Sequence, residues 1–121
     1  MKPNNSVTIS GRLASIGYAL NGWRLLLKRE PNTRLHLAAT IVVLAAAVLT
    51  GLSKTEWLAI VFAIAMVWLA EGFNTCIELF CDLYCGGQYN RAVGIVKDIA
   101  AGVVLLASVA SLAIGIIVFF L

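Results

Sequence analysis

The segment Glu71-Gly72-Phe73-Asn74-Thr75-Cys76-Ile77-Glu78-Leu79-Phe80-Cys81-Asp82 places three acids and an amide in a predicted helix that is otherwise mostly apolar. It continues without a break from the apolar run of residues 57–70, which predicts the outer part of a membrane span. At about 100° per residue, four polar side chains fall within an arc of about 80°: Glu71, Asn74, Glu78 and Asp82. An ionisable group inside a membrane costs at least about 2.5–3.5 kcal/mol, so this acidic stripe indicates a functional site or a contact that assembles helices.

The composition is that of a membrane protein. Of the 121 residues, 61% are hydrophobic and 12% are charged, whereas soluble proteins carry about 25% charged residues. The chain has room for about three spans, so residues 1–121 are predicted to form a single domain without a separate soluble part. The net charge of +3 is small, and we expect no nucleic-acid partner. The three cysteines form no CxxC pair and the one histidine is distant, so neither zinc nor a disulfide framework is expected.

Residues 7–30 predict an amphipathic helix. Basic and polar side chains fall on other faces than the apolar ones, a pattern suited to a helix that lies in the lipid headgroup plane. Pro31 is expected to end this helix, because proline disfavours helical backbone in the residue before it. The apolar residues that recur at helical spacing are Ile9, Leu13, Ile16, Leu20, Trp23 and Leu27.

Three membrane spans are predicted after this surface helix, at residues 35–52, 57–84 and 96–121. The loop at residues 85–90 contains glycines but is too short to be a phosphate-binding P-loop. Small side chains in the third span either let helices approach closely or reflect only the composition of an alanine-rich helix. These small residues are Ala101, Ser108, Ser111 and Gly115.

The basic residues predict the orientation. Eight of the nine Lys and Arg residues precede the first span or lie between the second and third spans, and only Lys54 lies on the other side. The positive-inside rule therefore predicts a cytoplasmic N-terminus and an external C-terminus.

The orientation brings most of the acids to one side of the membrane. With Glu56 at the outer surface, the helical rise puts Glu71 about 22 Å deeper, within the inner leaflet of a core about 30 Å thick. Glu78 then lies near the inner boundary. Five acids are predicted to converge on this cytoplasmic rim: Glu30, Glu71, Glu78, Asp82 and Asp98.

Carboxylates beside basic residues suit a magnesium–phosphate ligand, because Mg²⁺ takes oxygen ligands and is commonly held by carboxylates and substrate phosphates. A Glu71 carboxylate in the leaflet could accept the proton of a lipid hydroxyl, and Lys97 could neutralise phosphate charge. A proton or cation pathway would also use intramembrane carboxylates. A non-catalytic membrane subunit, in which the stripe only pairs with neighbouring helices, is a third possibility.

Two motifs resemble those of the bacterial diacylglycerol kinase/undecaprenol kinase family. One is Glu71-x-x-Asn74-Thr75-x-Ile77-Glu78 followed by Asp82, and the other is Lys97-Asp98-Ile99-Ala100-Ala101-Gly102-x-Val104-Leu105. Gly17-Tyr18-Ala19 with Gly22, and Glu30-x-Asn32-x-Arg34-x-His36, support the resemblance. It extends from about Arg12 into the third span.

The resemblance implies an all-α integral membrane protein of the bacterial inner (cytoplasmic) membrane, with an N-terminal surface helix and three transmembrane helices. It further implies a homotrimer whose active sites are shared between subunits, ATP as the phosphoryl donor, Mg²⁺ as the metal and a lipid alcohol as the acceptor.

The resemblance also implies the roles of individual residues. Glu71 resembles the catalytic base, and Glu30 and Glu78 resemble the magnesium ligands. The family's nucleotide-contacting Arg stands one position earlier than Arg12, where this chain has Gly11. The residues expected at the ATP site are Tyr18, Glu30, Asn74, Glu78, Lys97, Asp98 and Arg12, and further candidates are Asn32, Arg34 and Asp82.

The segment from Glu30 to His36 is more similar to the undecaprenol kinase branch than to the proteobacterial diacylglycerol kinase branch. Undecaprenol is therefore the expected acceptor, with diacylglycerol as the alternative.

Overall fold

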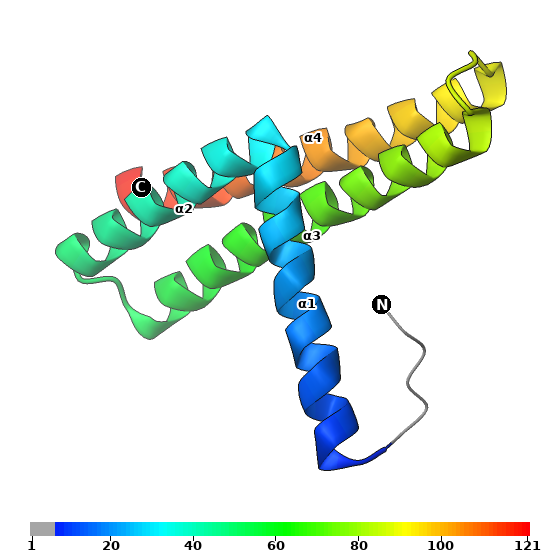
Figure 1. The fold of residues 1–121 in the computed structure, drawn as a ribbon. Helices are drawn as coiled ribbons and strands as arrows, with labels where there is room; N and C mark the ends of the chain where they lie inside the picture. The colour runs from blue at the N-terminus through cyan, green and yellow to red at the C-terminus, as the bar shows by residue number, and fades with distance from the viewer. Residues whose placement is uncertain (1–6) are drawn as a thin grey trace.

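The computed structural model describes residues 7–121 and contains four helices: α1 (Ile9–Arg29), α2 (Pro31–Thr50), α3 (Lys54–Cys85) and α4 (Arg91–Phe120). α2, α3 and α4 lie alongside one another, and α1 projects from this bundle (Figure 1). The most extensive packing is between α3 and α4. The prediction of an all-helical chain with three long apolar helices is confirmed, because α2, α3 and α4 are each long and apolar enough to cross a membrane.

The outer surfaces of α2, α3 and α4 are apolar and exposed. Examples are Val42 on α2, Phe62 on α3 and Leu106 on α4, each with about two-thirds of its surface accessible. A monomeric soluble protein rarely exposes so large an apolar surface, whereas lipid acyl chains cover one readily. These helices are therefore those of a multi-pass membrane protein.

A sharp corner joins α1 to α2, and Thr33 lies at its centre. The Thr33 side chain is completely buried, and its hydroxyl lies 2.6 Å from the carbonyl oxygen of Glu30 and 3.1 Å from that of Leu26. Its proton is thus shared between two carbonyls at the end of α1, each of which also accepts a backbone N–H.

Arg34 fixes the same corner from the other side of the turn. Its Nε donates to the carbonyl oxygen of Leu27 at 3.0 Å, and one terminal nitrogen donates to that of Lys28 at 2.8 Å. A cation at a helix C-terminus also interacts favourably with the helix dipole. Arg34, which the sequence offered as a candidate site residue, therefore holds the last turn of α1 against the first turn of α2.

We expect Thr33→Val to destabilise the protein without changing its shape. The substitution keeps the volume and removes the O–H donor at the corner, and a net hydrogen bond contributes about 0.5–1.5 kcal/mol. Thermal unfolding in detergent measures the effect. Thr50→Val is the matched control, because the exposed Thr50 hydroxyl bonds only within α2. Equal stability of the two variants would contradict the role of Thr33.

The transmembrane helices begin earlier than the spans predicted from hydrophobicity. Pro31 occupies the first turn of α2, where its missing N–H is no loss, so α2 starts before residue 35. Ser53 and Glu56 form a capping box that starts α3 before residue 57. Asn90 caps α4 through its side-chain oxygen, which accepts from two backbone N–H groups, so α4 starts before residue 96. The added turns extend each helix at its N-terminus.

Small residues line the contact between α3 and α4. Ala63 of α3 and Ala100 and Ala107 of α4 are buried, and the Ser111 hydroxyl donates to the Ala63 carbonyl oxygen at 2.9 Å. Small side chains let membrane helices approach closely. Of the small residues singled out in the third span, Ser111 is confirmed as a contact between helices.

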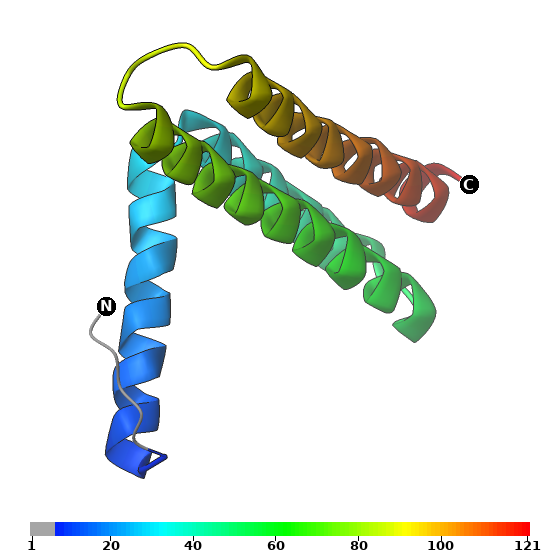
Figure 2. The same cartoon turned by 90° about the vertical axis from the view of Figure 1, so that its right-hand side faces the viewer.

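α1 leaves the bundle at the level of Trp68. The ring of Trp23 meets that of Trp68 edge to face, with centroids 5.7 Å apart. Towards its N-terminus, α1 diverges from the other helices (Figure 2). Its apolar side chains on this part remain exposed within the described chain: Ile9, Leu13, Ile16 and Leu20.

Candidate active site

Glu71 lies on α3 and is buried where this helix meets α2. Its side chain is 6% exposed, and its Oε2 lies 3.5 Å from Nε2 of His36. Glu71 follows the apolar part of α3, whereas His36 comes from the second turn of α2, directly after the corner that Thr33 and Arg34 fix. The corner therefore determines which α2 side chain faces the buried carboxylate.

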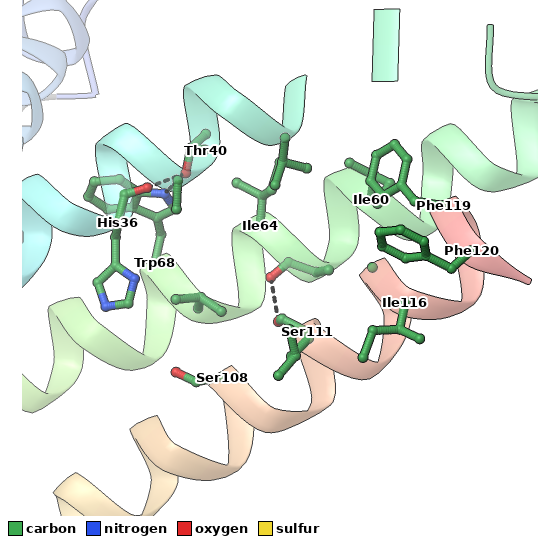
Figure 3. Close-up of a pocket in the computed structure, with 16 residues that line it drawn as sticks. His36, Thr40, Ile60, Ile64, Trp68, Ser108, Ser111, Ile116, Phe119 and Phe120 are labelled. Atoms are coloured by element: carbon green, nitrogen blue, oxygen red, sulfur yellow. Dashed lines mark hydrogen bonds between the residues drawn. The ribbon is translucent and has the colours of Figure 1, made fainter. Parts of the chain in front are cut away.

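A short polar and aromatic network supports His36. Trp68 Nε1 donates to Thr40 Oγ1 at 3.0 Å, and Thr40 Oγ1 donates to the carbonyl oxygen of His36 at 2.7 Å. The His36 and Trp68 rings lie edge to face with centroids 6.4 Å apart (Figure 3). These contacts join α2 to α3 one turn of α3 away from Glu71.

The same network forms one end of a cavity of about 330 Å³ between α2, α3 and α4. Figure 3 shows His36, Thr40 and Trp68 at one end, and Phe119 and Phe120 at the other. Ser108 and Ser111 are the remaining hydroxyls among its lining residues. The cavity is therefore mostly apolar, with its polar end beside His36.

Asn74 and Glu78 interact one turn apart on α3. The Asn74 amide nitrogen donates to Glu78 Oε1 at 3.1 Å. The other amide atom, Asn74 Oδ1, and the Thr75 hydroxyl oxygen are buried and have no hydrogen-bond partner among residues 7–121. Buried polar atoms are rarely unpaired in native proteins. The Asn74 amide oxygen and the Thr75 hydroxyl are therefore the unpaired buried polar atoms beside the acidic stripe.

Asp82 and Lys97 connect α3 to α4. Lys97 Nζ donates to Asp82 Oδ1 at 2.6 Å, and both side chains are accessible. α2 starts at Pro31, about five residues before His36 meets Glu71, so Glu78 and Asp82 lie on the part of α3 that extends past α2. The acidic stripe thus contacts α2 at Glu71 and α4 at Asp82.

The structure brings together only part of the predicted site. In residues 7–121, no group of three or more His, Cys, Asp and Glu side chains is arranged to hold a metal ion. Glu30 lies at the corner between α1 and α2, and Asp98 is exposed on the first turns of α4. Among the predicted site residues, those whose side chains make no hydrogen bond or ion pair with other described residues are Arg12, Tyr18, Glu30, Asn32 and Asp98.

His36 is the site residue that sequence reasoning missed. Its position in the segment Glu30-x-Asn32-x-Arg34-x-His36 pointed to a branch of a family, and no chemical role was assigned to it. The available signal was a lone imidazole near the N-terminal end of a span, since ionisable groups in membrane segments are rare and functional by default.

The prokaryotic diacylglycerol kinase family model matches residues 17–119. The chain belongs to the prokaryotic diacylglycerol kinase family. The matched range contains the acidic stripe, His36 and Lys97. The family suggested by the two motifs is thus confirmed, and so is the prediction that its members are lipid kinases.

Two curated relatives are similar to this chain. The diacylglycerol kinase of Synechocystis sp. is 33% identical over 103 residues, which is 85% of this chain and 59% of the relative. The undecaprenol kinase of Bacillus subtilis is 36% identical over 92 residues, which is 76% of this chain and 74% of the relative. The chain thus spans somewhat more than half the length of the Synechocystis protein. No solved structure is significantly similar to this chain.

Proposed function

We propose that this protein is an ATP- and Mg²⁺-dependent lipid kinase, which transfers the γ-phosphoryl group of ATP to the hydroxyl of a membrane lipid alcohol. The observation that carries the proposal is the buried Glu71 carboxylate, which lies on an apolar helix and faces His36. Proteins place an ionisable group in a membrane span at a free-energy cost, so its presence indicates chemistry there. Membership of the diacylglycerol kinase family supports the same activity.

The protein is proposed to lie in the bacterial cytoplasmic membrane with its N-terminus in the cytoplasm. α1 would lie in the headgroup plane, with its exposed apolar side chains in the acyl region. Because α1 leaves the bundle at Trp68, one turn before Glu71, this arrangement puts Glu71 close to the inner boundary of the bilayer. A lipid hydroxyl at headgroup depth could then reach the carboxylate, and nucleotide could approach from the cytoplasm.

Glu71 is proposed to act as the general base. Its carboxylate accepts the proton of the lipid hydroxyl as the hydroxyl oxygen bonds to the γ-phosphorus, and the bond from that phosphorus to the bridging oxygen breaks to release ADP. Phosphoryl transfer needs little covalent work from a protein beyond positioning, charge neutralisation and a base. General acid–base catalysis contributes about 10²–10⁴-fold to such a step.

The oxygen atoms on α3 fit a hard cation. Glu78 offers a carboxylate and Asn74 a buried, unpaired amide oxygen, and Mg²⁺ prefers such ligands together with phosphate oxygens. Glu78 and Glu30 are proposed to hold Mg²⁺, which when bound would neutralise charge on the ATP phosphates. Few protein ligands are needed, since Mg²⁺ usually keeps several waters and substrate oxygens.

The remaining predicted residues are proposed to bind the nucleotide. Lys97 would exchange its contact with Asp82 for a phosphate oxygen, and Asp98, Tyr18 and Arg12 would complete the site. Within one chain, Tyr18 and Arg12 make no hydrogen bond or ion pair with Asn74 or Lys97, whose side-chain partners are Glu78 and Asp82. A homotrimer with shared sites, which the family resemblance implies, would supply the missing neighbours, and the exposed apolar faces of the helices are available for such contacts.

Undecaprenol is the proposed acceptor, and diacylglycerol is the alternative. The relative named as an undecaprenol kinase and the relative named as a diacylglycerol kinase are about equally similar to this chain. The segment from Glu30 to His36 favours undecaprenol.

Phosphate transfer from labelled ATP tests the proposal. Purified protein in detergent would be offered undecaprenol and diacylglycerol, separately and in competition, with Mg²⁺ and with a chelator. We expect labelled undecaprenyl phosphate as the main product, formed only with Mg²⁺. Preferential labelling of diacylglycerol would make it the acceptor in place of undecaprenol. Absence of transfer to both, by folded protein with Mg²⁺, would contradict a kinase of these alcohols.

A further inference from the structure

We propose that His36 is a positioning residue, which orients the Glu71 carboxylate towards the lipid hydroxyl. The inference rests on the proposed kinase function and adds to it a residue of α2 that acts through the base. His36 Nε2 lies 3.5 Å from Glu71 Oε2. Within residues 7–121, His36 is the one side chain that makes a polar contact with Glu71.

A carboxylate that receives a proton must present one oxygen to the substrate and keep the other in place. A donor on the second oxygen restricts rotation of the carboxyl group and leaves the first oxygen free. With a proton on Nε2, the imidazole presents such a donor to Oε2 whether or not the ring is charged. The separation of 3.5 Å exceeds that of a good hydrogen bond, as is common for catalytic contacts in the absence of substrate.

Contacts with Thr40 and Trp68 restrain His36. Thr40 donates to the His36 carbonyl oxygen and accepts from Trp68, which restrains the backbone at residue 36, and the His36 and Trp68 rings lie edge to face. The α1–α2 corner fixes the start of the helix that carries His36. Partners that hold a positioning group are themselves part of a preorganised site.

A side-chain series at residue 36 tests the proposal. His36→Gln retains an N–H donor at about the distance of Nε2 from the backbone, whereas His36→Leu fills similar space without any donor. We expect His36→Leu to lower kcat about tenfold, since a hydrogen bond to a charged group contributes on that order, with KM for ATP unchanged. We expect His36→Gln to recover most of the kcat.

Control measurements separate positioning from packing. Thermal unfolding of both variants reports the packing role of the ring, and Thr50→Val on the same helix reports the effect of losing a polar group remote from Glu71. Positioning predicts that kcat follows the donor while stability does not. Equal kcat for the Gln and Leu variants, whether both match the unsubstituted protein or both are equally reduced, would overturn it.

The same assays distinguish a failure of the kinase proposal from a failure of the positioning role of His36. If the unsubstituted protein transfers no phosphate to either alcohol, the kinase proposal fails, and the positioning role fails with it. If the unsubstituted protein is active and the two variants are indistinguishable, only the positioning role fails.

Discussion

Glu71→Gln is expected to lower kcat about 10²–10⁴-fold, which is the usual contribution of a positioned general base. The amide has the size of the carboxylate and cannot accept the hydroxyl proton. Because the substitution leaves the phosphate-binding residues intact, the affinity for MgATP should stay within about twofold of that of the unsubstituted protein. Initial rates at saturating lipid and a separate nucleotide-binding measurement distinguish the two effects.

Glu56→Gln is the matched control for this prediction. Glu56 lies in the capping box at the opposite end of α3, so the same chemical change there should leave kcat unaffected. Turnover by Glu71→Gln close to that of Glu56→Gln would remove Glu71 from the role of base. It would also favour the reading in which the acidic stripe only assembles helices.

Lys97→Met is expected to lower kcat/KM for ATP by about tenfold to a hundredfold. A charge-assisted hydrogen bond to phosphate contributes about 1.5–3 kcal/mol, and methionine keeps the length of the side chain without its charge. The substitution also removes the contact with Asp82 between α3 and α4. ATP titrations at saturating lipid measure the change.

Two further variants isolate the phosphate contact of Lys97. Asp82→Asn weakens the same ion pair but keeps the ammonium, so it should reduce kcat/KM less than Lys97→Met does. Lys54→Met, a matched change at the start of α3 on the other side of the membrane, should have no effect. If Asp82→Asn and Lys97→Met reduced kcat/KM equally, Lys97 would serve only to join α3 and α4.

Local sequence patterns predicted the helices because each pattern depends on neighbouring residues. Hydrophobic runs identified α2, α3 and α4, and the spacing of apolar residues identified α1. The missed first turns were also encoded locally. The Ser53–Glu56 capping box, proline in the first turn of α2 and the Asn90 cap are start signals that a hydrophobicity reading of the spans overlooks.

The contacts that define the candidate site depend on tertiary packing and were less predictable. The acidic stripe was visible because its residues share one helix. The partners of these residues were not visible, because the contact between His36 and Glu71 depends on how the α1–α2 corner places α2. The role of Arg34 also escaped prediction, because a charged residue near a helix end fits a phosphate site and a helix cap equally well. The lipid and nucleotide came from the family resemblance.

The most direct test of the account is the stoichiometry of ATP consumption in liposomes. Reconstituted protein would receive MgATP with and without undecaprenol, and ADP and lipid phosphate would be measured in the same samples. A lipid kinase predicts equal amounts of ADP and undecaprenyl phosphate, and almost no ADP without a lipid alcohol. ADP formed without lipid phosphate would indicate an ATPase or an ATP-driven transporter. No ADP under either condition, with diacylglycerol as well, would contradict phosphoryl transfer at Glu71.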